Sequence, residues 1–158
     1  MSAYASLGQP YSAGLSTQID RRADAPAAGA GLVYTPNERY VHRLVAVVFT
    51  LVTSAVVANR FVSLSYLNGS GNAFCTDGTA VGVQASSTYT FAGSIERGTS
   101  EWGDGQTIYF PLSPVFLYPG NTLSIAVANM DVGDQLSAVE FLFDRFVTGN
   151  TVPPGLPE

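Results

Sequence analysis

The chain has 158 residues, which is enough for one domain with a buried core. It is 46% hydrophobic and only 12% charged, with a net charge of −5, so uncharged polar residues or partner proteins must cover much of its surface. Its seven basic residues are all arginines, scattered except for Arg21 and Arg22, and this argues against a direct nucleic-acid partner.

Residues 1–35 differ in composition from the rest and are predicted to form an extended N-terminal arm and linker. They are rich in Ala, Gly, Ser and Pro, and no period of 2 or 3.6 persists along them. The stretch DAPAAGAG is typical of a flexible linker. One interpretation is a disordered tail, and the other is an arm that docks on a neighbouring subunit. The predicted arm anchors are Tyr4, Tyr11, Leu15 and Ile19, with Arg21 and Arg22 as ion-pair partners.

Residues 36–147 are predicted to form an all-β domain, a β-sandwich or jelly roll of about seven or eight strands. NRFVSLSYLNGSG places Val62, Leu64 and Tyr66 on one face and ends in an Asn-Gly turn. STYTFAGSI and YPGNTLSIAVAN alternate in the same way, whereas TIYFPLSPVFLY contains prolines that suit an edge strand or a corner. Short strands with a turn signal about every ten residues are typical of a sandwich.

The segment LVAVVFTLVTSAVV, residues 44–57, contains no charge, amide, glycine or proline. It is shorter than the roughly 20 residues of a membrane span, so no membrane partner is expected. A buried helix is possible because Leu44, Val47 and Leu51 share a helical face, but the many β-branched residues favour a strand. Both faces of that strand are apolar, which predicts that another layer, the arm or a second subunit covers the second face. The second face consists of Leu44, Ala46, Val48 and Val52.

The segment LSAVEFLFDRFV, residues 136–147, has two interpretations. Leu136, Val139 and Phe143 fit a helical stripe, whereas Val139, Phe141 and Phe143 fit one face of a strand. Its aromatic residues and the all-β surroundings favour the strand. Residues 148–158, TGNTVPPGLPE, are predicted to be a Pro/Gly-rich C-terminal tail without a core-forming pattern.

Cysteine use and the N-terminal sequence bear on where the protein is made. Cys75 is the single cysteine, so neither an internal disulfide nor a site with several thiolate ligands is expected. The first residues, MSAYASLGQPYSAGLSTQ, contain no basic region and no continuous apolar stretch, so they do not match a signal peptide. Synthesis in a reducing cytosol is therefore expected.

Candidate catalytic and metal-binding residues are few. His42 is the single histidine and stands just before the apolar strand, which favours a satisfied or strand-end imidazole over a catalytic one. The carboxylates form two loose pairs in glycine-rich turns, Glu101 with Asp104 and Asp131 with Asp134. Turn chemistry explains such pairs, and calcium binding or glycoside hydrolysis are the sharper alternatives. No catalytic residue, metal or cofactor is therefore predicted.

One aromatic pair suggests a surface role. Trp102 lies in a glycine-rich segment, and Tyr109 follows it closely in the sequence. Together they are a possible interface or ligand site, including a platform on which a sugar ring stacks. A lone Trp in such a loop is more often a packing lid or an interface residue.

The stretch ERYVHRLVAVVFTLVTSAVVANRFVSLSYLNGSG, followed by LYPGNTLSIAV and by the turn VGDQLS before a last strand, resembles a family. It is similar to small virion proteins of tailed bacteriophages, namely decoration, head-fibre and minor structural proteins. The resemblance covers about residues 38–147 and carries no catalytic signature. It implies β-sandwich proteins that assemble as oligomers, often trimers, on the particle.

These observations lead to three functional hypotheses. The first is a capsid decoration or cement protein, made in the host cytoplasm, that acts in the virion as a homotrimer and clamps subunits of the major capsid protein. The second is a tail or fibre component that binds a host receptor or glycan through Trp102 and Tyr109. The third and weakest is a hydrolase that uses Glu101 and Asp104.

Overall fold

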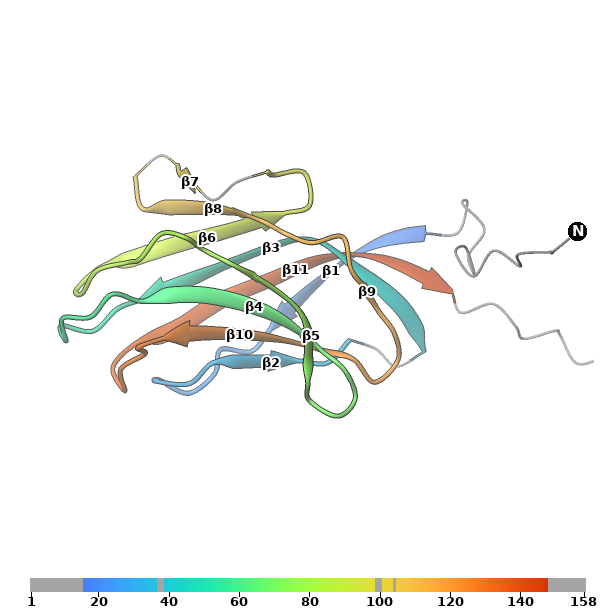
Figure 1. Cartoon of the computed structure of the whole chain (residues 1–158), viewed down its shortest axis with the longest axis horizontal. Helices are drawn as coiled ribbons and strands as arrows, with labels where there is room; N and C mark the ends of the chain where they lie inside the picture. Colours follow the sequence, from blue (N-terminus) through green and yellow to red (C-terminus); the bar gives the residue numbers. More distant parts are fainter. Residues whose placement is uncertain (1–15, 37–38, 99–100, 104, 148–158) are drawn as a thin grey trace, which may run out of the picture.

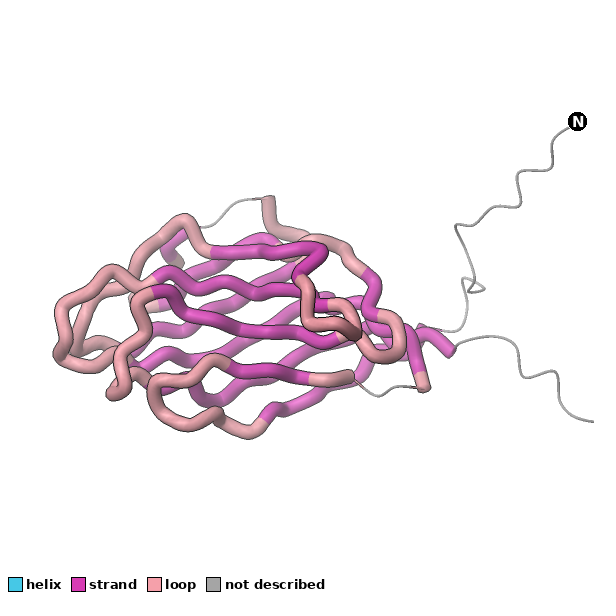
Figure 2. Tube along the Cα trace, turned by 60° about the horizontal axis from the view of Figure 1, so that its bottom comes forward, coloured by secondary structure: helices cyan, strands magenta, loops and turns pink. Residues whose placement is uncertain are grey.

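The computed structural model describes residues 16–36, 39–98, 101–103 and 105–147. Within these residues the chain forms β-strands and no helix (Figures 1 and 2). The all-β class predicted from the sequence is confirmed. The strands are β1 (Ser16–Ala23), β2 (Leu32–Tyr34), β3 (Tyr40–Val52), β4 (Phe61–Leu67), β5 (Ala73–Gly78), β6 (Thr88–Ser94), β7 (Glu101–Trp102), β8 (Thr107–Pro111), β9 (Phe116–Leu117), β10 (Thr122–Ala128) and β11 (Gln135–Val147).

The strands form two sheets that pack face to face, which confirms the predicted β-sandwich. The large sheet has the order β1-β11-β3-β6-β8-β7, with β9 also paired to β3. The small sheet has the order β2-β10-β4-β5. Neighbouring strands are antiparallel except for β6 and β8, which are parallel. The more specific assignment to a jelly roll stays a prediction.

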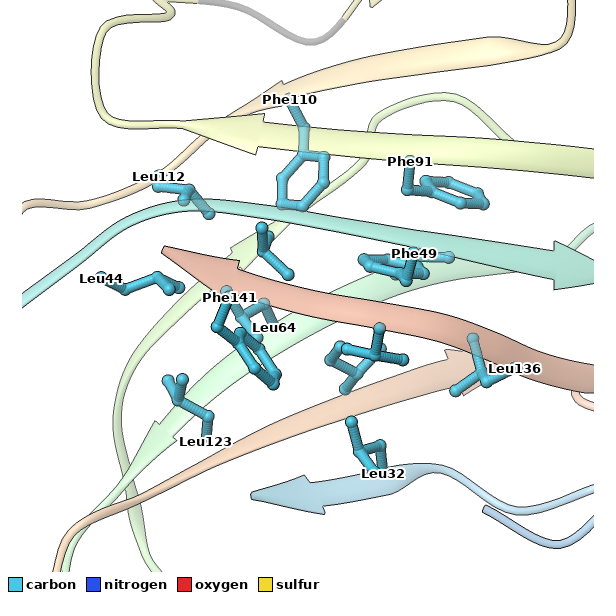
Figure 3. Packing of buried hydrophobic residues seen from close by; sticks show 14 of the residues in the cluster. Leu32, Leu44, Phe49, Leu64, Phe91, Phe110, Leu112, Leu123, Leu136 and Phe141 are labelled. Atoms are coloured by element: carbon cyan, nitrogen blue, oxygen red, sulfur yellow. The ribbon is translucent and has the colours of Figure 1, made fainter. Parts of the chain in front are cut away.

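The hydrophobic core lies between the two sheets (Figure 3). The ring of Phe49 on β3 stacks on Phe91 of β6 with the ring centroids 5.0 Å apart, and Phe110 of β8 lies edge-on to Phe49 at 6.4 Å. From the small sheet, Leu64 and Leu123 are buried in the same cluster. Apolar residues at every second position of these strands therefore meet between the layers, as the alternating pattern predicts.

A β-bulge in β3 changes which side chains face the core. Val45 is an extra residue between Leu44 and Ala46, because these two pair with consecutive residues of β11. The bulge turns both Leu44 and Val47 into the core, although they are three positions apart and would face opposite sides of a regular strand. The predicted second face therefore does not include Leu44, which is fully buried inside the sandwich.

A second bulge explains the two interpretations of residues 136–147. The pairing of β11 with β3 shifts between Ser137 and Glu140, where Ala138 has a φ of 49°. Because of the extra residue, Leu136 and Val139 both face the core at a spacing of three. That spacing resembles one helical turn, but the segment is the strand β11, as favoured from the sequence.

The N-terminal part of the sandwich differs from the predicted boundary at residue 35. β1 pairs with β11, and β2 pairs with β10, so both strands belong to the chain's own sheets. Ile19 and Ala23 of β1 pack against the core, and Leu32 of β2 is buried. These apolar residues are too widely spaced to show a period, yet backbone pairing holds them in place. Residues 1–15 of the predicted arm and the tail 148–158 lie outside the described residues.

The long apolar strand predicted over residues 44–57 ends earlier than expected. β3 stops at Val52, and residues 53–57 form a loop. The hydroxyl of Thr53 donates to the carbonyls of Gln84 and Ser87 at 2.7 and 3.0 Å. The backbone amide of Thr53 also donates to the carbonyl of Ser87 at 2.8 Å, so these bonds fix the chain at the point where the strand ends. Val56 and Val57 of the predicted strand are consequently exposed.

Candidate functional site

The outer face of the large sheet is the candidate functional surface. Alternation along β3 buries Val47, Phe49 and Leu51 and leaves Val48 and Val52 on the opposite face, 43% and 40% exposed. Within the described residues no other layer of the chain covers this face. The pairing of β1, β11, β3, β6 and β8 aligns a row of side chains across the face. That row is Arg22, Glu140, Val48, Ala92 and Tyr109.

Two hollows adjoin on this outer face. The first, of about 540 Å³, lies over β1, β11 and β3, and the second, of about 630 Å³, lies over β3 and β6. Both are lined by Ala46 and Val48, so they share a floor. Small residues such as Ala46 and Ala92 make the floor low, because longer side chains stand on either side of them. The result is a shallow apolar depression across four strands.

Charged side chains border the depression and are engaged by neighbours. On the β1 side, Nε of Arg22 donates to Glu140 at 3.1 Å, and this pair is exposed. The hydrogen bond and charge of Glu140 raise the pKa of Arg22, which stays cationic. On the β8 side, the guanidinium of Arg97 lies 3.8 Å from the ring centre of Tyr109. The middle of the face is therefore apolar, and both borders carry a cation.

The outer face of the small sheet is different. Pairing aligns Val33, Ser124, Ser65 and Thr76 across its four strands. The hydroxyls of Ser65 and Thr76 lie 3.0 Å apart and form a hydrogen bond. Polar side chains on one face and apolar ones on the other are typical of a sheet that faces water. On the large sheet the strip of Ala46, Val48 and Ala92 departs from this pattern, although Thr50, Thr90 and Ser94 lie on the same outer face.

The acidic turn at Asp131 and Asp134 is tied to a buried arginine that the sequence did not single out. Arg60 and Asp134 are both fully buried, and Nε of Arg60 donates to Oδ2 of Asp134 at 2.5 Å. The carboxylate of Asp134 also accepts the backbone N–H groups of Ser54 and Asp131 at 2.7 and 2.8 Å. The turn thus has a structural role. The feature of the sequence that could have indicated this role is Arg60, a single arginine that directly follows an uncharged stretch.

Hydrogen bonding keeps both carboxylates of this turn ionised. Burial by itself raises the pKa of Asp134, but hydrogen bonds from Arg60, Asp131 and Ser54 outweigh it, so the pKa lies below its usual value. The Gly133 amide and the Ser54 hydroxyl lower the pKa of Asp131. For Asp134 the stabilisation is therefore present above the unfolded-state pKa of about 3.9 and is lost as the pH falls through the folded pKa.

His42 is buried on β3 among aromatic and cationic side chains. Its ring lies edge-on to Phe143 of β11, with the centroids 5.4 Å apart. Burial is the main cause that lowers the pKa of His42, and the charges of Arg145 and Arg21 lower it further. The imidazole is therefore neutral at neutral pH. The expected satisfied or partly exposed strand-end histidine is corrected, because the ring is buried and its Nδ1 has no hydrogen-bond partner among the described residues.

Acidification below about pH 6.5 is expected to destabilise the chain through His42. The unfolded chain binds a proton at this histidine while the folded chain, with its lowered pKa, does not, so stability falls as the pH drops toward the folded pKa. Denaturant unfolding at a series of pH values checks this. A His42→Phe variant is expected to lose stability less steeply between about pH 6.5 and 5. An equally steep loss in the variant would contradict the assignment to His42.

The predicted arm residues are only partly within the described structure. Tyr4, Tyr11 and Leu15 lie outside it. Ile19 lies on β1, is partly buried and packs against the chain's own core, and its role as an anchor on a partner stays a prediction. The reason for this packing is the register of β1, which pairs Ile19 with the core residue Phe143 of β11. Arg22 forms an ion pair within its own chain, and Arg21 is exposed.

The predicted ligand residues lie near one border of the outer face. Trp102 is on β7 and Tyr109 on β8, and the two strands pair with each other. The side chains of Glu101 and Trp102, and the whole of Asp104, lie outside what the structure describes. A Cβ at Gly103 would come 2.1 Å from the Tyr109 ring, and Arg97 also contacts that ring, so neighbours already pack on it.

Neither a metal-binding cluster nor a membrane-spanning helix is present in the described part of the chain. There, no three carboxylate, imidazole or thiol side chains gather closely enough to hold a metal ion. Nor do these residues include a helix long and apolar enough to cross a membrane.

Comparisons with known proteins give little guidance. No known family model matches the sequence, and a comparison with curated proteins gives no match either. Among solved structures, that of infectious bursal disease virus, Gx strain, is similar over 84% of this chain and 37% of its own, at 11% identity and a TM-score of 0.27. This chain therefore spans well under half of that viral chain.

Proposed function

We propose that the chain is a structural protein of a virus particle that decorates the shell as a homo-oligomer and bridges coat subunits. The observation that supports this is the apolar strip on the outer face of the large sheet, where the exposed Val48 lines two adjoining hollows and Val52 is exposed on the same face. Contiguous apolar surface of this kind typically marks a protein interface. The low content of charged residues favours the same function.

In this proposal the outer face meets neighbouring protein subunits, with the major capsid protein and further copies of this chain as partners. The resemblance over residues 38–147 to phage decoration and minor virion proteins supports a trimer on the particle, after synthesis in the host cytoplasm. A clamp of this kind acts through many modest contacts on different coat subunits, all of which must be lost before the shell opens. No catalytic step and no cofactor are part of the proposal.

The test is to place a charge in the middle of the outer face. Val48→Arg combined with Ala92→Arg is expected to abolish self-association or particle binding, because a buried unpaired guanidinium at an interface is strongly unfavourable. The oligomeric mass by light scattering and co-sedimentation with particles depleted of this protein are the measurements. The melting temperature should change little, since Val48 is 43% exposed and Ala92 is half-buried in the single chain.

A matched control is Val33→Arg on the small sheet, where the valine is 64% exposed beside serines. This variant should assemble and bind particles like the wild type. If the double variant on the outer face also assembles and binds like the wild type, the proposed function loses its structural basis. The number of copies per particle then separates a shell protein, present in hundreds, from a tail component.

The alternative function, receptor or glycan binding by a tail or fibre component, has less support. Its candidate platform includes Tyr109, whose ring is already contacted by Arg97. Loss of glycan binding in Trp102→Ala, together with a few copies per particle, would favour this alternative.

A further inference from the structure

Three loops lie together at one end of the sandwich, the left end of Figure 1. They join β1 to β2, β3 to β4 and β10 to β11. Loop tips normally carry polar side chains, but here the exposed side chains are mainly apolar. Val57 and Val132 are 92% and 83% exposed, the highest values among large hydrophobic residues in the described part of the chain. We define the apolar tip as Ala27, Ala28, Val56, Val57 and Val132.

The buried ion pair of Arg60 and Asp134 holds two of these loops. The carboxylate of Asp134 accepts the amide of Ser54 in the β3–β4 loop and the amide of Asp131 in the β10–β11 loop. The guanidinium of Arg60 donates to the carbonyls of Val56 and Ala58, each at 3.0 Å. The backbone on both sides of Val57 is therefore fixed from beneath by charge-assisted hydrogen bonds.

The third loop is bound to the same turn. The amide of Gly29 donates to the carbonyl of Asp134 at 2.8 Å, and Nε2 of Gln135 donates to the carbonyl of Pro26 at 2.8 Å. Gly29 has a φ of 73°, and a Cβ there would lie 2.7 Å from the Cα of Val132. Only glycine permits this approach. The three loops thus form one unit in which the backbone that carries the apolar tip is anchored.

This arrangement matters for binding. A single exposed valine needs no explanation, but here several exposed apolar side chains stand on adjoining loops whose hydrogen bonds are made inside the protein. Side chains held in a fixed arrangement lose less conformational entropy when they are buried by a partner. The most fully buried ion pair of the described structure therefore supports its most exposed apolar side chains.

Charge indicates what kind of partner fits. The whole chain has a net charge of −5, yet all five side chains of the apolar tip are uncharged. The one arginine in these loops, Arg60, is fully buried, so the loops present no exposed cation to an anionic lipid surface. Of the carboxylates in these loops, Asp24 is exposed at the end of β1, whereas Asp131 and Asp134 are engaged by backbone amides of the turn. Recognition by the apolar tip itself must therefore come from apolar contact and shape.

We propose that the apolar tip inserts into an apolar recess on a partner protein, which under the proposed function is a coat subunit of the shell. The inference rests on that function for the identity of the partner. It adds a second contact, at the loop end of the sandwich, to the outer face of the large sheet. Contacts at two separate surfaces let one subunit bridge two neighbours.

The test is a pair of substitutions on the apolar tip, Val57→Asp with Val132→Asp, in the full chain. Co-sedimentation with particles depleted of this protein should show that affinity falls about tenfold or more, because two carboxylates cannot enter an apolar recess unpaired. Oligomeric mass and melting temperature should not change, since both side chains are exposed and neither takes part in the Arg60 network. Val33→Asp, at a comparably exposed valine on β2, is the matched control and should bind normally.

The possible outcomes separate the inference from the proposed function. Wild-type protein that fails to bind the particles overturns the proposed function and the inference with it. Wild-type binding with equal binding by the tip variant overturns the inference alone. A changed oligomeric mass in the tip variant assigns the tip to contacts between copies and also overturns it. Flotation of the wild type, but not of the variant, with phosphatidylcholine or phosphatidylserine vesicles would assign the tip to a lipid surface. That result would also overturn the inference.

Discussion

Arg60→Met is expected to lower the free energy of unfolding by about 3–5 kcal/mol, which is a large part of the stability of a typical domain. The substitution leaves the carboxylate of Asp134 fully buried without its counter-ion. It also removes the donors that hold the carbonyls of Val56 and Ala58. Equilibrium unfolding in denaturant, with the free energy extrapolated to water, is the measurement.

Two control variants make this expectation specific. Arg60→Lys keeps the charge but loses the planar fork that reaches several acceptors, so an intermediate loss is expected. Arg22→Ala removes the ion pair with Glu140, which is exposed, and should change stability little. If Arg60→Met is no less stable than Arg22→Ala, the buried pair does not organise the loop end as described.

Phe49→Ala is expected to cost about 3–5 kcal/mol of unfolding free energy, because it opens a cavity in the centre of the core. The Phe49 ring is fully buried, stacks on Phe91 and contacts the edge of Phe110 (Figure 3). It therefore links three adjacent strands of the large sheet, β3, β6 and β8. Denaturant unfolding monitored by tryptophan fluorescence and by circular dichroism measures the loss.

The matched control for Phe49 is Phe74→Ala on β5. Phe74 is 48% exposed and lies 6.4 Å from the ring of Tyr66, so its truncation removes far less buried surface. It should lower stability by well under half as much. Equal losses at the two positions would mean that the ring cluster around Phe49 is not the centre of the core.

Much of the fold follows from patterns that depend on neighbours in the sequence. The alternation of Val62, Leu64 and Tyr66 predicted one buried face of β4, and all three are buried. β1 and β2 were missed because their apolar residues are few, and pairing with β11 and β10 supplies the hydrogen bonds that hold them. β5 was missed for a similar reason, since its side chains are exposed or only half-buried.

The candidate surfaces were only partly predictable. That the second face of the strand around Val48 is apolar was evident from the residues, and the structure shows it exposed on the single chain. Leu44, however, does not belong to that face, because the bulge at Val45 turns it inward. The apolar tip was not predicted, since Val56 and Val57 were assigned to a buried strand.

By itself the sequence determined the all-β class, the sandwich of two layers and most strands that form its core, because side chains alternate along a strand with a period of two. Only the tertiary structure decided where that period is interrupted and which charges meet. The bulges in β3 and β11 arise from pairing between segments about ninety residues apart along the chain, and no local pattern encodes them. Arg60 and Asp134 are 74 positions apart. Their ion pair, and the three loops that it holds, exist only once both sheets have packed.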